Sequence, residues 1–117
     1  MNTMNTMITN PRSTRTYARA RELIRLMRKL SEHLDGFADL RDQGRRAACA
    51  TLLLFAEGCG RRTLKDRRRF FDMAKGSAYE VVAVADAAYD LGLVDEQLQE
   101  RIADIGDKLG GLLYRVR

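Results

Sequence analysis

The stretch FAEGCGRRTLKDRRRFFDMAKGSAYE, residues 55–80, holds the end of one predicted helix, a short polar turn and the start of another helix. Gly58 and Gly60 are typical of a helix end, and Thr63 is a suitable N-cap for the helix that follows. Residues 61–69 carry six positively charged side chains against one aspartate. No pair of side chains in the stretch can act as nucleophile and base, so it predicts a helical bundle with a charged end rather than an enzyme.

Apolar residues recur at steps of three and four on both sides of this stretch. The pattern covers about residues 16–33, 37–58 and 96–116, and the helix that begins after Thr63 continues to about residue 91. Asp95 is a suitable N-cap for the last helix. Because the connections are short, we predict an all-α fold, an antiparallel up-down-up-down four-helix bundle over residues 15–117. The polar repeat MNTMNTM lies in residues 1–14, which we predict to be a disordered leader.

The apolar positions of the last two helices define their predicted packing faces. The third helix carries one stripe of Phe71, Ala74, Ala78, Val81, Ala85 and Ala88, and a second stripe of Met73, Ser77, Glu80, Val84, Ala87 and Leu91. The fourth helix carries a heptad seam of Leu98, Ile102, Ile105, Leu109, Leu112 and Val116. Gly106, Gly110 and Gly111 lower its helix propensity, so we expect them at close helix contacts.

Composition indicates one domain of a cytoplasmic protein. The chain has 117 residues, one proline, no tryptophan and no apolar run long enough for a membrane helix. Its first residues lack the apolar core of a signal peptide, and its two cysteines form no disulfide framework. The single histidine, His33, makes a histidine metal site or a histidine-based triad improbable. We expect no catalytic residue, no metal and no cofactor.

The second helix is apolar on every side over residues 47–56, which contain no charge. A helix of this kind is expected to be buried all round, and a small bundle leaves one side of each helix toward solvent. We therefore predict a subunit interface here.

The predicted topology collects positive charge at one end of the bundle. Residues 1–69 contain 16 Lys/Arg and 7 Asp/Glu, whereas residues 70–117 contain 5 and 9. Arginines suit phosphates, and a sequence-tolerant contact to an RNA or DNA backbone is one interpretation. One alternative is a solvated, arginine-rich end that pairs with the acidic end of a neighbouring subunit. Another is a protein-interaction scaffold that docks an acidic partner such as a reverse transcriptase. The candidate nucleic-acid-binding residues are Arg15, Arg19, Arg61, Arg62, Lys65, Arg67, Arg68, Arg69 and Arg117.

Three further side chains in this region are candidates for special chemistry. Glu57 and Glu80 have largely apolar neighbours in the sequence, so we expect them to be buried with partners, and Arg61 is at helical spacing from Glu57. Cys59 precedes two arginines that could lower its thiol pKa, although a packed or merely exposed thiol is the simpler interpretation. Phe70 and Phe71 are expected in the core rather than stacked on bases.

The order of short motifs resembles a known family. RRAA at residues 45–48, AEG at 56–58, FFDMAKGSAYE at 70–80 and LGLVDEQLQERI at 91–102 are similar to the four-helix-bundle proteins named after the intervening sequences of large-subunit rRNA genes. Related bundles include the accessory variability proteins of diversity-generating retroelements, which bind nucleic acid and a reverse transcriptase. The resemblance implies a bacterial protein that forms a ring-shaped homopentamer, has no catalytic activity and binds nucleic acid.

The resemblance covers residues 17–117, with one departure. The motif positions of the family correspond here to Glu57, Gly58, Gly76, Ser77 and Glu80. The family commonly has a proline and an asparagine just before AEG, where this chain has Leu52 and Leu54. The second helix should therefore be straighter and more apolar than in its relatives, and no role of that asparagine carries over.

Overall fold

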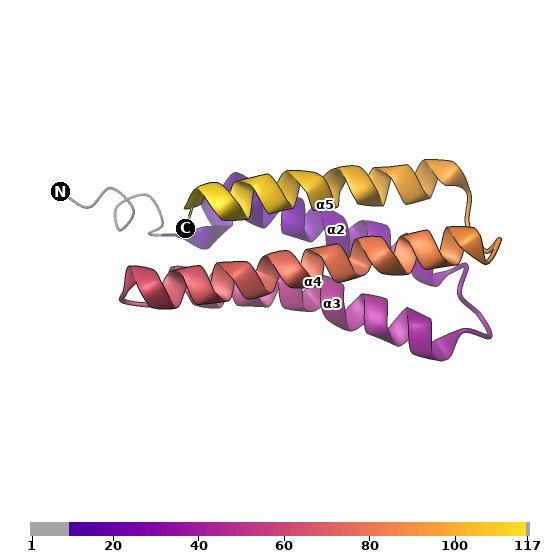
Figure 1. Cartoon of the computed structure of the whole chain (residues 1–117), viewed down its shortest axis with the longest axis horizontal. Helices are drawn as coiled ribbons and strands as arrows, with labels where there is room; N and C mark the ends of the chain where they lie inside the picture. The colour runs from indigo at the N-terminus through magenta and orange to yellow at the C-terminus, as the bar shows by residue number, and fades with distance from the viewer. Residues whose placement is uncertain (1–9, 117) are drawn as a thin grey trace.

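The computed structural model describes residues 10–116, and in this range the chain forms a short 3-10 turn followed by four long α-helices. They are η1 (Pro11–Ser13), α2 (Arg15–Ser31), α3 (Ala38–Cys59), α4 (Leu64–Asp90) and α5 (Glu96–Val116). Successive helices run in opposite directions (Figure 1), and each packs on the next, with α2 also packing on α5. The predicted antiparallel up-down-up-down four-helix bundle is confirmed.

Local sequence signals set the helix ends. Thr14, Thr63 and Asp95 each accept a hydrogen bond from the backbone N–H three residues later, through a side-chain oxygen at 2.9–3.1 Å. The predicted caps at Thr63 and Asp95 are therefore confirmed. Gly36 and Gly92 adopt φ values of +87° and +77° in the turns after α2 and α4, a backbone conformation that other residues rarely take.

The chain before α2 is more ordered than predicted. Pro11–Ser13 form η1, and Asn10 caps it by accepting a hydrogen bond from the backbone N–H of Arg12. This turn packs on both α2 and α3. The prediction of a disordered leader is therefore wrong for residues 10–14, because side-chain caps and contacts with two helices order them, and residues 1–9 lie outside the described part.

The core follows the predicted stripes with one shift. All six residues of the first α4 stripe are buried, and Phe71 packs on Phe55 with ring centroids 5.5 Å apart. In α5 the buried residue of the last turns is Leu113, whereas Leu112 is only half-buried. The heptad prediction is wrong at this turn, because a straight helix has 3.6 rather than 3.5 residues per turn and its buried face drifts.

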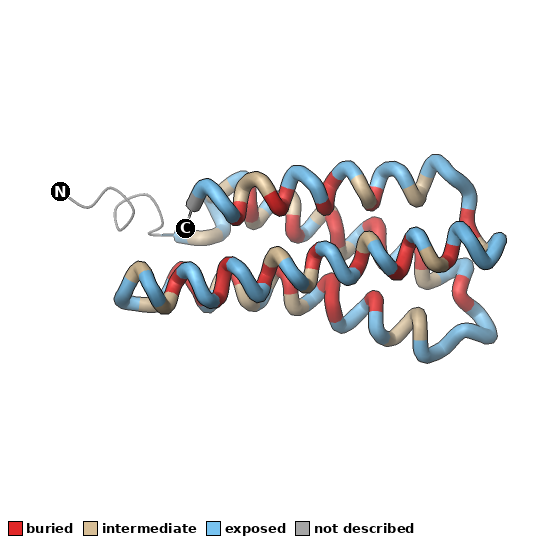
Figure 2. The backbone as a smooth tube through the Cα atoms, viewed as in Figure 1, coloured by how far each residue is buried: buried red, intermediate tan, exposed pale blue. Residues whose placement is uncertain are grey.

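The outer face of α3 and part of the second α4 stripe are left uncovered in the single chain (Figure 2), although Val84 of that stripe is buried in the core. Leu53 is 65% exposed and Met73 is 39% exposed, while Cys49 is also exposed. The outer face of α3 is therefore exposed within one chain, as the predicted subunit interface requires, and that interface stays a prediction. Its apolar outer face remains consistent with contact between copies.

Candidate nucleic-acid interface

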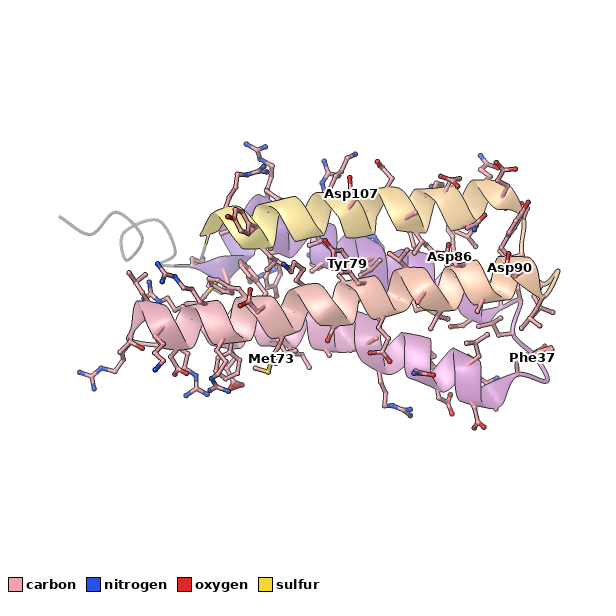
Figure 3. All side chains as sticks on the ribbon, in the orientation of Figure 1. Phe37, Met73, Tyr79, Asp86, Asp90 and Asp107 are labelled. Carbon is pink, nitrogen blue, oxygen red and sulfur yellow. The ribbon has the colours of Figure 1, made fainter. Side chains whose placement is uncertain are left out.

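The topology brings the start of α2, the end of α3, the start of α4 and the end of α5 to one end of the bundle (Figure 1). We call this the basic end; its described cations are Arg12, Arg15, Arg19, Arg61, Arg62, Lys65, Arg67, Arg68, Arg69 and Arg115. Arg117 lies outside the described residues. The opposite end holds exposed carboxylates, of which Figure 3 labels Asp86 and Asp90. The molecule therefore carries opposite charges at its two ends.

The hairpin of α3 and α4 extends beyond the ends of α2 and α5 (Figure 1). Arg62, Lys65 and Arg68 lie at or just after its turn, and all are exposed. Within the described residues none of them makes an ion pair. We call these residues the tip cations. Their full charge faces solvent, which suits contact with an extended anion.

Two other arginines of the hairpin form a local network. The guanidinium groups of Arg61 and Arg69 stack on the Phe70 ring, at 4.5 and 4.6 Å from its centroid. Both also pair with Asp66, at 3.8 and 3.0 Å, and Arg61 binds Glu57 at 2.6 Å. These contacts partly neutralise both arginines, so they contribute less to the outward charge than the tip cations do. Phe70 is 6% exposed, which confirms its predicted place in the core.

Arg67 does not lie on the surface at all. Its side chain is 8% exposed, and its Nε donates a hydrogen bond of 2.8 Å to the backbone carbonyl of Arg61. Its Nη1 has no partner among the described atoms. The prediction that Arg67 contacts a nucleic-acid backbone needs correction, because the turn after α3 folds over the guanidinium group and uses it to bind a carbonyl.

Cys59 lies buried close to this arginine. Burial raises the pKa of its thiol to about 11, and the opposing effect of the nearby Arg67 charge is smaller. A lowered pKa is therefore wrong, and the simpler interpretation of a packed thiol holds.

A second group of cations surrounds a groove between α2, α4 and α5. Its volume is about 490 Å³, and its walls include Arg15, Arg19, Lys108, Arg115 and the ring of Tyr79. Sequence reasoning missed Tyr79 because it lies in the middle of α4, and nothing in the local pattern places it beside residues of α2 and α5. We call this the tyrosine groove.

The five motif residues divide between a helix crossing and the uncovered face. Gly58 lies where α3 crosses α4, because a Cβ there would be 2.7 Å from the Phe71 ring. Gly76 has no atom within 4 Å of the same position, and Ser77 is half-buried beside it. Glu57 and Glu80 are exposed rather than buried, because no neighbouring helix covers them. The expected ion pair of Glu57 with Arg61 is confirmed.

Glu80 and the α5 glycines account for the remaining predicted contacts. Glu80 accepts a hydrogen bond of 3.0 Å from Gln43 of α3. Gly106 packs under Val82, and Gly110 packs under the Tyr79 hydroxyl, so both mark close contacts of α5 with α4 as predicted. Gly111 meets only its own helix neighbour, Arg115, so the same expectation is wrong there.

Two features of the described residues bear on other functions. They contain no group of three or more His, Cys, Asp or Glu side chains placed to hold a metal ion. None of the described helices combines the length and the apolar character that crossing a bilayer requires.

Comparisons with known proteins bear on both the fold and the family. A crystal structure at 1.70 Å of a protein of unknown function from the S23 ribosomal protein family of Bacteroides thetaiotaomicron superposes with a TM-score of 0.77. It is 13% identical and covers 86% of this chain and 96% of that one, so it supports the fold. No curated protein matches. The sequence profile described as 23S rRNA-intervening sequence protein matches residues 12–115, and the chain therefore belongs to this family.

Proposed function

We propose that this protein is a non-enzymatic, oligomeric helical bundle that binds the RNA or DNA backbone through its basic end. The observation that carries the proposal is the set of tip cations, which are exposed, lack ion pairs within the described chain and extend beyond the rest of the bundle. Cations at the start of a helix oppose its macrodipole, at a cost of about 0.3–1 kcal/mol each. A feature that lowers stability in this way supports a role in binding.

Assembly would multiply a weak contact of each chain. The uncovered face of α3 and α4 carries Leu53, Met73 and Gly76, which are all exposed in the described part of the chain. We propose that copies of the chain pack through this face, and the family resemblance favours a pentamer. Light scattering would measure the mass, and Leu53→Glu should lower it without unfolding the protein. An unchanged mass for Leu53→Glu would count against this face.

The binding proposal is tested by the salt dependence of affinity. Each phosphate contact contributes about 0.7–0.9 to the slope of log K against log salt. Replacing Lys65 and Arg68 by glutamine should lower the slope for random RNA by about 1.4–1.8 per chain engaged. The matched control replaces Arg25 and Arg28, which are exposed along α2 away from the tip, and removes the same charge. A flat salt response, or equal losses in the two variants, would overturn the proposal.

A second function is docking of an acidic protein partner, such as a reverse transcriptase. One observation favours it. A groove of about 480 Å³ between α2 and α3 has an apolar floor including Ile24 and Met27 and a rim including Arg28, Arg41 and Arg45. The Nε atom of Arg41 has no hydrogen-bond partner among the described atoms. Recovery of a protein partner after nuclease treatment, lost on substitution of these arginines, would favour docking over nucleic-acid binding.

A further inference from the structure

The tyrosine groove differs from the tip because it combines cations with an accessible aromatic ring. Tyr79 is 49% exposed and lies between α4 and α5, near Asp107 (Figure 3). At the tip, by contrast, the nearby aromatic residue is Phe70, which is buried and already contacted by the guanidinium groups of Arg61 and Arg69. The groove therefore offers both kinds of contact together, which the tip does not.

Gly110 leaves the space that the Tyr79 ring occupies, because it has no Cβ. A Cβ at Gly110 would lie 3.1 and 3.2 Å from the Cζ and Cε1 atoms of the ring and still closer to its hydroxyl. The ring therefore lies in the space that a side chain of α5 would fill. Because one side rests on the α5 backbone and about half of the residue is exposed, a planar group can approach it from solvent.

The charges around the ring are unevenly engaged. Arg19 pairs with Glu22 at 3.0 Å, and Lys108 pairs with Asp104 at 3.0 Å. Arg15 and Arg115 make no ion pair with any described residue, although both line the groove. These two arginines are thus available to a phosphate. Asp107 also lines the groove; its carboxylate repels a phosphate but accepts hydrogen bonds from the amino group of a base.

We propose that the tyrosine groove binds one unpaired nucleotide of a single-stranded nucleic acid. The base stacks on Tyr79, and the adjoining phosphate binds Arg15 and Arg115. The groove volume of about 490 Å³ lies within the range of small-ligand sites. Bases in a duplex already stack on each other and cannot reach the ring, so the groove selects single strands while the tip cations bind any backbone. This inference rests on the proposed function of the basic end.

The chain itself offers a reporter for this test, because it has no tryptophan. Tyr79→Trp places a single indole in the groove, and single-stranded oligoadenylate should quench its fluorescence strongly. Tyr89→Trp is the matched control, on the same helix at the acidic end and 38% exposed. A duplex RNA of the same length should bind Tyr79→Trp without this quenching. Equal quenching by duplex and single strand, or quenching equal to that of the control, would overturn the inference.

Affinity measurements separate this inference from the broader proposal. Tyr79→Ala should weaken single-strand binding about 5- to 150-fold and leave duplex binding unchanged, whereas Tyr79→Phe should retain most of the affinity. Circular dichroism checks that each variant is folded. If both nucleic acids bind in a salt-dependent way and Tyr79→Ala changes neither affinity, the backbone function stands and the groove inference fails. If neither nucleic acid binds the unaltered protein, both proposals fail.

Discussion

Gly58→Ala tests how tightly α3 and α4 pack at their crossing. The added Cβ would lie 2.7 Å from Cε1 of Phe71 and 2.9 Å from Cβ of Phe70, closer than real Cβ contacts. The Phe71 ring is fully buried and packs on Phe55, so it has no space into which to move. The helices must therefore separate or the rings must leave their preferred rotamers.

The expected loss of stability follows from two opposing effects. Overpacking by one methyl group costs about 1–3 kcal/mol, and alanine gains up to about 1 kcal/mol over glycine inside a helix. Gly58 precedes the last residue of α3, so little of that gain applies. The net loss is about 1–3 kcal/mol, which lowers Tm by about 4–12 °C at about 4 °C per kcal/mol for a chain of this size.

Two other glycines provide graded controls for the thermal-melting experiment. In Gly44→Ala the new Cβ would meet the flexible end of Met27 at 2.7 Å, so a rotation of the thioether should keep the loss below that of Gly58→Ala. In Gly111→Ala the nearest atom is the Arg115 Nη1 at 3.7 Å, and Tm should rise by up to about 4 °C. A Gly58→Ala variant as stable as Gly111→Ala would refute the proposed crossing.

Three further changes follow from the same contacts. Arg67→Met should lower the free energy of unfolding, measured by chemical denaturation, by about 1.5–3 kcal/mol, because the Arg61 carbonyl loses a charged hydrogen-bond donor. The slope of log K against log salt for RNA binding should stay unchanged, and a lower slope would show that Arg67 contacts the RNA. Folding raises the pKa of the Cys59 thiol from 9.0 to about 11, so the unfolded chain loses this proton at a lower pH than the folded protein does. The free energy of unfolding should therefore fall as pH rises from about 9 toward 11, and Cys59→Ala should remove that fall. At pH 8, thiol reagents should modify the exposed Cys49 before the buried Cys59. Gly76→Ala should raise Tm in dilute protein, since an added Cβ would meet no atom within 4 Å and alanine favours the helix. If copies of the chain pack at Gly76, the same change should weaken assembly. Light scattering that shows unchanged assembly would place the interface elsewhere.

Much of the fold could be predicted because its signals are local. Residues such as Thr63 and Asp95 cap the helices that immediately follow them, and the spacing of Ala74, Ala78 and Val81 identifies the buried side of α4. These signals depend on chemistry within one or two helical turns. The charge of each helix end, combined with short loops, was also enough to predict that positive charge collects at one end of the bundle.

Exposure and neighbours across helices depended on the tertiary structure. Arg67 and Arg68 are adjacent and chemically identical, but successive residues of an α-helix point about 100° apart. The Arg67 side chain therefore points toward the turn after α3 and is buried there, whereas the Arg68 side chain points into solvent. Likewise, Tyr79 becomes a candidate stacking surface only because Gly110 and Arg15, distant in the sequence, come to lie beside it. The sequence alone determined the helices, their polarity and the charge at each end. The tertiary structure decided which cations face solvent and which aromatic ring accompanies them, because burial is set by packing between helices rather than by the local chain.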